Sequence, residues 1–383
     1  MARRSTARLG IWLLLACGAA GFLAGQTAPS TTGARGAPAV YACGWVMNGP
    51  AFSACYWRDG QFFALEPRAA EGQDSYARAI AVSGDHVYVA GDYSDGRTLI
   101  PCCWIDGKRV ELQGGAPPLG ATATCIALSG DAVVIGGTYS DGTSDHPCYW
   151  EKGIRVELDE GRSCVDAELR SIAVADGTVY ACGSLYVGPN RVGCLWNDGV
   201  LKKFARYFQP EALCIGGRGP AIVGADLAKV AVWDGATLRD LPVDSILGDR
   251  HADAIAFSEG GLLLAGYHRL PHAGTALPCL WRGDRRVDLP VPEGQNGYAC
   301  SISVAGGSVF VGGFHGLMSS IPCYWRDGTL IDLPCPEDDA RVTAIFAEER
   351  DPAAATTSPP AATTGPPAAT TSPPGTPTAP AAP

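Results

Sequence analysis

Residues 79–91 read Ala79-Ile80-Ala81-Val82-Ser83-Gly84-Asp85-His86-Val87-Tyr88-Val89-Ala90-Gly91, and this stretch decides the fold. It continues through Pro101-Cys102-Cys103-Trp104 and Asp106-Gly107 to Val110-Glu111-Leu112. The unit of about 46 residues recurs seven times, and a tryptophan marks each copy: Trp57, Trp104, Trp150, Trp196, Trp233, Trp281 and Trp325. A repeat of this length is typical of a propeller or a solenoid.

Each copy contains four short β patterns bounded by Gly, Asp and Pro. Asp-Gly pairs such as Asp106-Gly107 follow most of the marker tryptophans and favour tight hairpins. Four strands per repeat make one propeller blade. The alternative, a β-solenoid, usually has shorter repeats.

The two ends of the repeat region predict that the ring closes. The first copy begins at its second strand, Val40-Tyr41-Ala42-Cys43-Gly44, and residues 342–347 form a first strand that has no copy of its own. We therefore predict an all-β, seven-bladed propeller with four antiparallel strands per blade, in which residues 342–347 complete blade 1. Closure of this kind leaves no blade without a strand, which limits the exposure of open sheet edges.

The turn positions also predict a register. A hairpin centred on Gly84 and Asp85 pairs Ala79 with Ala90, and a hairpin centred on Gly96 pairs Ala90 with Cys102. The same register pairs Tyr88 with Trp104, so we expect cross-strand aromatic pairs in several blades. The equivalent pairs are Tyr41 with Trp57, Tyr180 with Trp196, and Phe310 with Trp325.

Two pairs among the 15 cysteines fit this register. Cys43 takes the place of Ala90 opposite Cys55, and Cys182 takes it opposite Cys194. Directly opposed positions can satisfy disulfide geometry, so both pairs are candidate bridges in an exported protein. The other recurrent cysteines, two residues before the marker tryptophans, are expected to be small buried hydrophobes.

The chain ends predict export. Arg3, Arg4 and Arg8 precede an apolar run, so residues 1–25 resemble a signal peptide or a lipoprotein signal. Cys17, in Leu14-Leu15-Ala16-Cys17, is the candidate lipidation site, with cleavage after Gly25 or an uncleaved anchor as alternatives. We expect a flexible linker at 26–37, the propeller at 38–349, and a disordered Pro/Ala/Thr-rich tail at 350–383.

Charge and composition limit the partners. The formal net charge of −10 disfavours a nucleic-acid partner. No second stretch looks like a spanning helix, so we expect membrane contact only through the N-terminal signal or lipid anchor. We expect a monomer.

Aromatic residues follow the glycine that ends the second strand in most copies. By pseudo-symmetry they would ring one mouth of the propeller and could stack on a sugar or a peptide. The alternative, which we favour, is that they pack on neighbouring blades, because repeated positions are usually structural. The candidate ligand-binding residues are Trp45, Tyr93, Tyr139, Tyr186, Tyr267, His268, Phe314 and His315.

No catalytic, metal or cofactor motif is present, and we predict no catalytic residues, no metal site and no cofactor. His268, His272 and His315 could form a loose cluster, but such spacing is a weak metal signal. Asp92, Asp95, Asp141 and Asp145 are better explained as turn carboxylates than as calcium ligands. Carboxylates expected in loops between blades are Glu160, Asp166, Glu168, Asp249, Asp253, Glu293, Asp338 and Asp339.

The motif Ala-Ile-Ala-Val-Ser-Gly-x-x-Val-Tyr-Val-Ala-Gly resembles the bacterial β-propeller repeat family of exported and lipoprotein propellers. The resemblance implies the fold and an exported location, and it carries over no catalytic residues. The leading hypothesis is a binding or scaffolding module of the cell envelope for a glycan or protein ligand, and a non-enzymatic role is favoured. The alternatives are a polysaccharide-active hydrolase or lyase and a structural subunit of an envelope assembly.

Overall fold

The computed structural model describes residues 37–65, 73–114, 119–130, 132–161, 164, 166–204, 207–226, 229–241, 250–270 and 274–350. Every regular element among these residues is a β-strand. A search of the same residues finds no helix that could cross a membrane. The predicted signal at 1–25 with Cys17, nearly all of the linker at 26–37, and the tail after Arg350 lie outside the described residues.

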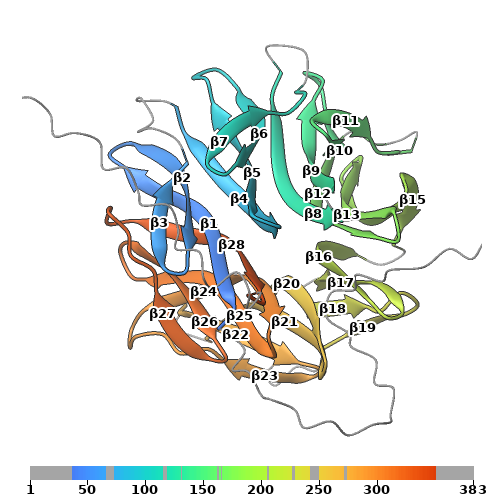
Figure 1. The fold of residues 1–383 in the computed structure, drawn as a ribbon. Coiled ribbons are helices and arrows are strands. Elements are labelled where there is room, and N and C mark those ends of the chain that lie inside the picture. Colours follow the sequence, from blue (N-terminus) through green and yellow to red (C-terminus); the bar gives the residue numbers. More distant parts are fainter. Residues whose placement is uncertain are drawn as a thin grey trace, which may run out of the picture.

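Seven four-stranded antiparallel sheets surround a central axis, as predicted (Figure 1). In each blade the first strand of the repeat is innermost and the fourth is outermost. Blade 1 contains β28 (Ala340–Glu348), β1 (Ala39–Asn48), β2 (Ala51–Arg58) and β3 (Gln61–Ala64). Blade 2 contains β4 (Ser75–Ser83), β5 (His86–Ser94), β6 (Leu99–Ile105) and β7 (Lys108–Glu111). Blade 3 contains β8 (Ala121–Ser129), β9 (Ala132–Ser140), β10 (Asp145–Glu151) and β11 (Ile154–Glu157).

The remaining four blades repeat this order. Blade 4 contains β12 (Asp166–Ala175), β13 (Thr178–Val187), β14 (Asn190–Asn197) and β15 (Val200–Lys203). Blade 5 contains β16 (Phe208–Gly216), β17 (Gly219–Asp226), β18 (Lys229–Trp233) and β19 (Leu238–Asp240). Blade 6 contains β20 (Arg250–Ser258), β21 (Gly261–Arg269), β22 (Ala276–Arg282) and β23 (Arg285–Asp288). Blade 7 contains β24 (Asn296–Ala305), β25 (Ser308–Gly316), β26 (Ser320–Arg326) and β27 (Thr329–Asp332).

Ring closure is as predicted. Strand β28, from the C-terminal end of the propeller, pairs antiparallel with β1, from Ala39 opposite Glu348 to Val46 opposite Ala340. The chain therefore completes blade 1 with strands from both ends. The Asp-Gly turns also behave as expected: Asp106 and Gly107 have φ values of 50° and 78°, which the tight hairpin requires.

The hydrophobic core is divided among the interfaces between blades. Seven buried clusters each combine residues of two neighbouring blades. Each marker tryptophan faces the preceding blade; Trp104, for example, is fully buried in a cluster with residues of blade 1. Four indole N–H groups, those of Trp57, Trp150, Trp196 and Trp325, donate to backbone oxygens in the connection between the two blades; for Trp150 the acceptor is Gln113 O, at 2.7 Å. The tryptophans thus join each blade to the one before it.

The register between the second and third strands differs from the prediction by one residue. Ala90 pairs with Cys103, and Val89, not Tyr88, pairs with Trp104. The loop after Ser94 holds four residues, closed by Asp95 Oδ1, which accepts the backbone N–H groups of Arg97 and Thr98. Because a one-residue shift moves every side chain to the other face, the predicted aromatic pairs are wrong. Trp57, Trp196 and Trp325 pair with Ala42, Ala181 and Val311.

The same shift removes the basis of the two predicted disulfides. Cys43 pairs with Tyr56, while Cys55 pairs with Gly44. Cys182 pairs with Leu195, while Cys194 pairs with Gly183. The members of each pair therefore point to opposite faces of their blade and lie in different core clusters. All four are free thiols in this structure.

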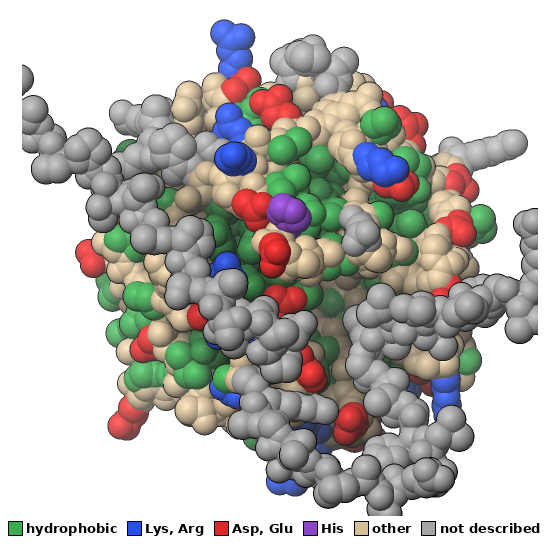
Figure 2. Space-filling view, in the orientation of Figure 1, with side chains coloured by type: hydrophobic (Ala, Val, Ile, Leu, Met, Phe, Trp, Pro, Cys, Tyr) green, Lys and Arg blue, Asp and Glu red, His purple; other side chains and the backbone are tan. Residues whose placement is uncertain are grey.

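Charge is mixed on the face seen in Figure 2. Outside the parts drawn in grey, acidic and basic side chains are interspersed there, and hydrophobic side chains lie among them. No broad basic patch is visible on this face, which agrees with the acidic composition.

Candidate functional site at the channel mouth

The innermost strands form a closed ring, and each contacts the next around the axis. All seven carry a β-bulge in their first half. In β4 the pairing passes from Ala77 opposite Gly91 to Ala79 opposite Ala90, which leaves Arg78 unpaired. The bulged residues, which we call the bulge ring, are Arg78, Thr124, Arg170, Glu211, Asp253, Cys300 and Thr343. All seven are at least partly exposed, whereas the residue before each is buried, so the ring lines the central channel.

The glycine that ends each Val-Tyr-Val-Ala-Gly pattern is required by this bulge. A Cβ atom at Gly266 would lie 2.0 Å from the backbone oxygen of His251, two residues before Asp253. At Gly91 it would lie 2.0 Å from the oxygen of Tyr76. The repeated glycine therefore permits the close backbone approach that turns one side chain of each inner strand into the channel.

Three of the four charged members of the bulge ring, Arg170, Glu211 and Asp253, lie in the successive blades 4 to 6. Arg170 Nη2 lies 3.0 Å from Glu168 Oε2, and Arg170 Nε lies 3.7 Å from Glu211 Oε2. Arg191 pairs with the other oxygen of Glu168 and donates to Gln209 Oε1 at 2.8 Å. These contacts form a network of alternating charge between the inner strands of blades 4 and 5 and β14 of blade 4.

Asp253 is the carboxylate of this group with no hydrogen bond or ion pair to any described residue. Burial, followed by the negative charge of Glu211, raises its pKa to about 7, although Arg170 acts in the opposite direction. Burial also raises the pKa of Glu211, against the effect of Arg170 and Arg191. The channel therefore holds a carboxyl group that changes charge near neutral pH.

Aromatic side chains follow the mouth of the channel from blade 6 to blade 2. The centroids of neighbouring rings lie 4.7–5.5 Å apart. At one point Arg341 stands between two rings, with its guanidinium carbon 4.6 Å from the centroid of Phe314 and 5.0 Å from that of Trp45. We call this chain of side chains the aromatic arc: His251, Tyr267, Tyr298, Phe314, Arg341, Trp45, Phe52 and Tyr76. Four of its members, Tyr76, His251, Tyr298 and Arg341, stand two residues before a bulged residue, so the arc borders the bulge ring.

The six predicted rim aromatics separate into two groups. Trp45, Tyr267 and Phe314 belong to the aromatic arc. Tyr93 and Tyr139 instead pack on the outermost strands. The ring centroid of Tyr93 lies 3.7 Å from the guanidinium carbon of Arg109, and that of Tyr139 lies 3.7 Å from the guanidinium carbon of Arg155. Tyr186 lies 5.9 Å from Arg191. Tyr93 and Tyr139 therefore pack within their own blades. Packing on a neighbouring blade, the favoured interpretation, describes Tyr267 and Phe314, which contact Tyr298 and Arg341 of the next blade.

His268 and His315 do not form the cluster that the sequence suggested. His268 Nε2 lies 3.1 Å from Asp288 Oδ1 on β23, and His315 Nε2 lies 2.8 Å from Asp332 Oδ1 on β27. Both imidazoles are buried, at 6% and 1% exposure, because they alternate with the arc residues that precede them. They stabilise their own blades and lie away from the mouth. His272 lies outside the described residues.

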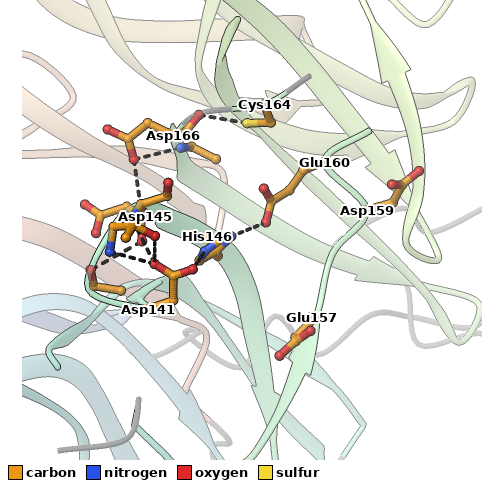
Figure 3. A network of polar contacts seen from close by, with 12 residues as sticks. Asp141, Asp145, His146, Glu157, Asp159, Glu160, Cys164 and Asp166 are labelled. Carbon is orange, nitrogen blue, oxygen red and sulfur yellow. Dashed lines mark hydrogen bonds and ion pairs between the residues drawn. The ribbon is translucent and has the colours of Figure 1, made fainter. Parts of the chain in front are cut away.

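Histidine does meet carboxylates at a third place, in blade 3 (Figure 3). His146 Nδ1 lies 2.7 Å from Glu160 Oε1, and its Nε2 lies 3.1 Å from Asp141 Oδ2. Burial alone would lower the pKa of His146, but the hydrogen bonds to these two carboxylates raise it. Asp141 also accepts the backbone N–H groups of Thr143 and Ser144 at 2.7 and 2.9 Å, and Asp166 accepts that of Asp145 at 2.9 Å.

Asp95 and Asp141 accept backbone N–H groups within their own turns, as expected for turn carboxylates. Asp92 differs, because it is buried and forms an ion pair with Arg78. The described residues contain no group of three His, Cys, Asp or Glu side chains that could hold a metal ion. Three carboxylates expected in loops lie in inner strands instead: Asp166, Glu168 and Asp253. Asp249 lies outside the described residues.

Sequence reasoning missed the bulge ring. The available signal was variation within a uniform repeat: one position, directly before the Ala-Ile-Ala-Val pattern or its equivalent, holds Arg, Thr, Arg, Glu, Asp, Cys and Thr in successive copies. Such variety is expected where a repeated fold presents different side chains at one binding surface.

Comparisons with known proteins assign no family to this chain. No protein-family model and no curated protein sequence matches the chain. Similar solved structures include a periplasmic gluconolactonase from Pseudomonas aeruginosa, at 10% identity and a TM-score of 0.48, covering 81% of this chain and 98% of that one. TolB from Acinetobacter baumannii has 12% identity, a TM-score of 0.43, and coverage of 82% and 67%. Trypanosoma rangeli sialidase in complex with the inhibitor DANA has 10% identity, a TM-score of 0.43, and coverage of 74% and 56%.

Proposed function

We propose that this protein is an exported β-propeller of the bacterial cell envelope that binds a glycan at the mouth of its central channel. The aromatic arc is the observation that carries the proposal. It provides ring faces along one side of the mouth, and the polar bulge ring lies directly beside it. Sugar rings stack on aromatic faces through their C–H groups, while their hydroxyls need hydrogen-bonding partners, and this arrangement provides both.

The exported location is supported by the N-terminal residues. Three arginines followed by an apolar run are the pattern of a signal sequence, and Leu14-Leu15-Ala16-Cys17 would allow a lipid anchor. Membership of the bacterial exported-propeller repeat family is part of the same proposal. A non-enzymatic role is favoured because the repeats contain no recognised catalytic motif.

Binding of the purified protein to an array of cell-wall glycans and envelope polysaccharides tests the proposal. Tyr298→Ala interrupts the centre of the arc, and we expect it to weaken saturable binding at least tenfold, because a stacked aromatic contributes about 1.4 kcal/mol or more. Tyr298→Phe should keep binding near the wild-type level. Tyr93→Ala is the matched control, since Tyr93 packs on Arg109 and Glu111 away from the arc. Equal loss in both alanine variants, or no glycan bound at all, would refute a glycan site at the arc and favour a protein ligand.

A second candidate function, hydrolysis or lysis of the bound glycan, is favoured by one observation. Glu211 and Asp253 occupy equivalent bulge positions in neighbouring blades, and both carboxyl groups have raised pKa values. A protonated carboxyl near pH 7 is suited to general acid catalysis. Mass spectrometry of glycans incubated with the wild type and with Asp253→Asn distinguishes the two functions: cleavage products that disappear in the variant would identify an enzyme.

A further inference from the structure

Blades 1 and 4 each bring a second cysteine toward the cysteine of their third strand. Cys335 lies in the connection between β27 and β28, and Cys164 lies in the connection between β11 and β12. Both connections lead into the innermost strand of the blade that contains the partner cysteine, Cys55 in β2 or Cys194 in β14. The connections into the other five blades contain no cysteine in their sequences. The two loop cysteines therefore lie in corresponding connections, although Cys335 follows the start of its connection more closely than Cys164 does.

In blade 1 the packing of Trp57 holds the connection in place. Trp57 Nε1 donates to the backbone oxygen of Pro334 at 2.8 Å, so the residue before Cys335 lies against the indole. Cys55 precedes Trp57 by two positions and therefore points to the same face. Cys55 is fully buried in the core cluster between blades 7 and 1, and Cys335, partly exposed, packs against that cluster. Burial raises the pKa of the Cys55 thiol, and the nearby thiol of Cys335 raises it further.

Blade 4 repeats the arrangement. Trp196 Nε1 donates to the oxygen of Asp159 at 2.6 Å, which holds the connection over the same face. Cys194 is fully buried in the cluster between blades 3 and 4, and Cys164 packs against this cluster from the loop. The Cys164 thiol donates to the oxygen of Asp166 at 2.9 Å, a contact drawn in Figure 3. Each pair thus combines one buried thiol with one thiol that an oxidant can reach.

We propose that the mature protein carries two disulfides, Cys55–Cys335 and Cys164–Cys194. Each Sγ–Sγ bond forms when two thiols lose two protons and two electrons to a disulfide oxidant, such as glutathione disulfide, which is reduced to two thiols. The first bond would link the N-terminal hairpin to the segment that leads into the closing strand β28. It would enclose about 280 residues and so covalently lock the ring. The occurrence of these bonds in the cell depends on the exported location proposed above, but their geometry does not.

Disulfide mapping of the whole protein tests this assignment. The protein is equilibrated with a glutathione redox buffer, its free thiols are alkylated, and it is digested without reduction. Trypsin should release residues 163–170 linked to residues 192–202, and residues 36–58 linked to residues 327–341. Because residues 36–58 contain both Cys43 and Cys55, a second digestion with chymotrypsin, which cleaves between them at Trp45, identifies the linked cysteine. Bridges at Cys43 or Cys182, or full alkylation of Cys335 and Cys164 after oxidation, would overturn the assignment.

Thermal stability provides an independent readout. Reduction should lower the Tm of the wild type by about 5–10 °C, and Cys335→Ser should remove a large part of that drop. Cys335 is partly exposed, so serine there should still permit folding. Cys214→Ser, another partly exposed cysteine with no partner in the proposal, is the control and should keep the full drop. An equal response to reduction in the wild type and Cys335→Ser would overturn the Cys55–Cys335 bond. Neither readout requires glycan binding, so failure of the proposed function would leave this result unchanged.

Discussion

At the scale of single residues, one position per repeat varies in chemistry from blade to blade. The bulge residue faces the channel in every blade, while the residue before it is buried. Arg170, Glu211 and Asp253 occupy three successive blades at this position, so their charges act on one another across a narrow space. A repeated backbone can therefore present a different side chain seven times at one surface.

Asp253 should make the stability of the protein depend on pH. Its pKa rises from the ordinary aspartate value of 3.8 to about 7 in the folded protein. Between these values the folded state keeps a proton that the unfolded state has released, so the free energy of unfolding falls as pH rises, and it levels off above pH 7. Asp253→Asn removes this loss. We expect the variant to be about 1–2 kcal/mol more stable than the wild type at pH 8, less than the full shift implies because Asp253 is partly exposed.

Urea denaturation at pH 5 and pH 8 measures this effect. The advantage of Asp253→Asn should shrink markedly at pH 5, where most Asp253 side chains in the folded protein are protonated. Asp95→Asn is a useful comparison, because turn hydrogen bonds lower the pKa of Asp95 and its loss should destabilise the protein at pH 8. An Asp253→Asn variant that gains nothing at pH 8 would show that Asp253 is fully solvated.

At the scale of elements, the bulge and the glycine opposite it form one unit. The inner strand contains one extra, unpaired residue. A backbone oxygen of that strand then comes close to the second strand, where glycine has no side chain to obstruct it. The turn after the second strand, which holds four residues in blades 2 and 3, then sets which face the tryptophan and the cysteine occupy. The sequence pattern contained the glycine and the turn residues, but their spacing alone did not reveal the bulge.

Gly266→Ala tests this unit. The added Cβ would lie 2.0 Å from the oxygen of His251 and 2.8 Å from the Cα of Ala252, both backbone atoms that cannot move aside without distorting β20. We expect a loss of roughly 3 kcal/mol in the free energy of unfolding. Gly217→Ala is the control, because its Cβ would meet no atom within 4 Å and should change stability by less than about 0.5 kcal/mol. Similar denaturation midpoints for the two variants would contradict a structural requirement at Gly266.

At the scale of the whole molecule, stability depends on closing the ring. Seven core clusters each need both neighbouring blades, so no blade has a core of its own. Strand β28 completes blade 1 and also supplies Val342 and Ile345 to the cluster shared with blade 7. Loss of that strand would expose β1 along its length and open the interface on both sides.

Truncation before Ala340 should therefore abolish cooperative unfolding, whereas truncation after Arg350 keeps β28 intact. Circular dichroism melts of the two proteins measure the difference. We expect the longer form to melt in one sharp transition and the shorter form to melt early, broadly and with aggregation. A Tm within about 2 °C of the longer form would mean that the ring does not require its closing strand.

The sequence by itself determined the number of blades, their four strands, the closure by residues 342–347, and the tight Asp-Gly turns. These features follow from local periodicity and turn chemistry, which a single chain displays directly. Tertiary structure alone decided the register after the second strand, the inward side chains of the bulge ring, the burial of His268 and His315, and the approach of Cys335 to Cys55. The physical reason is that each of these depends on a one-residue offset or on a contact between blades, and neither leaves a periodic trace in the sequence.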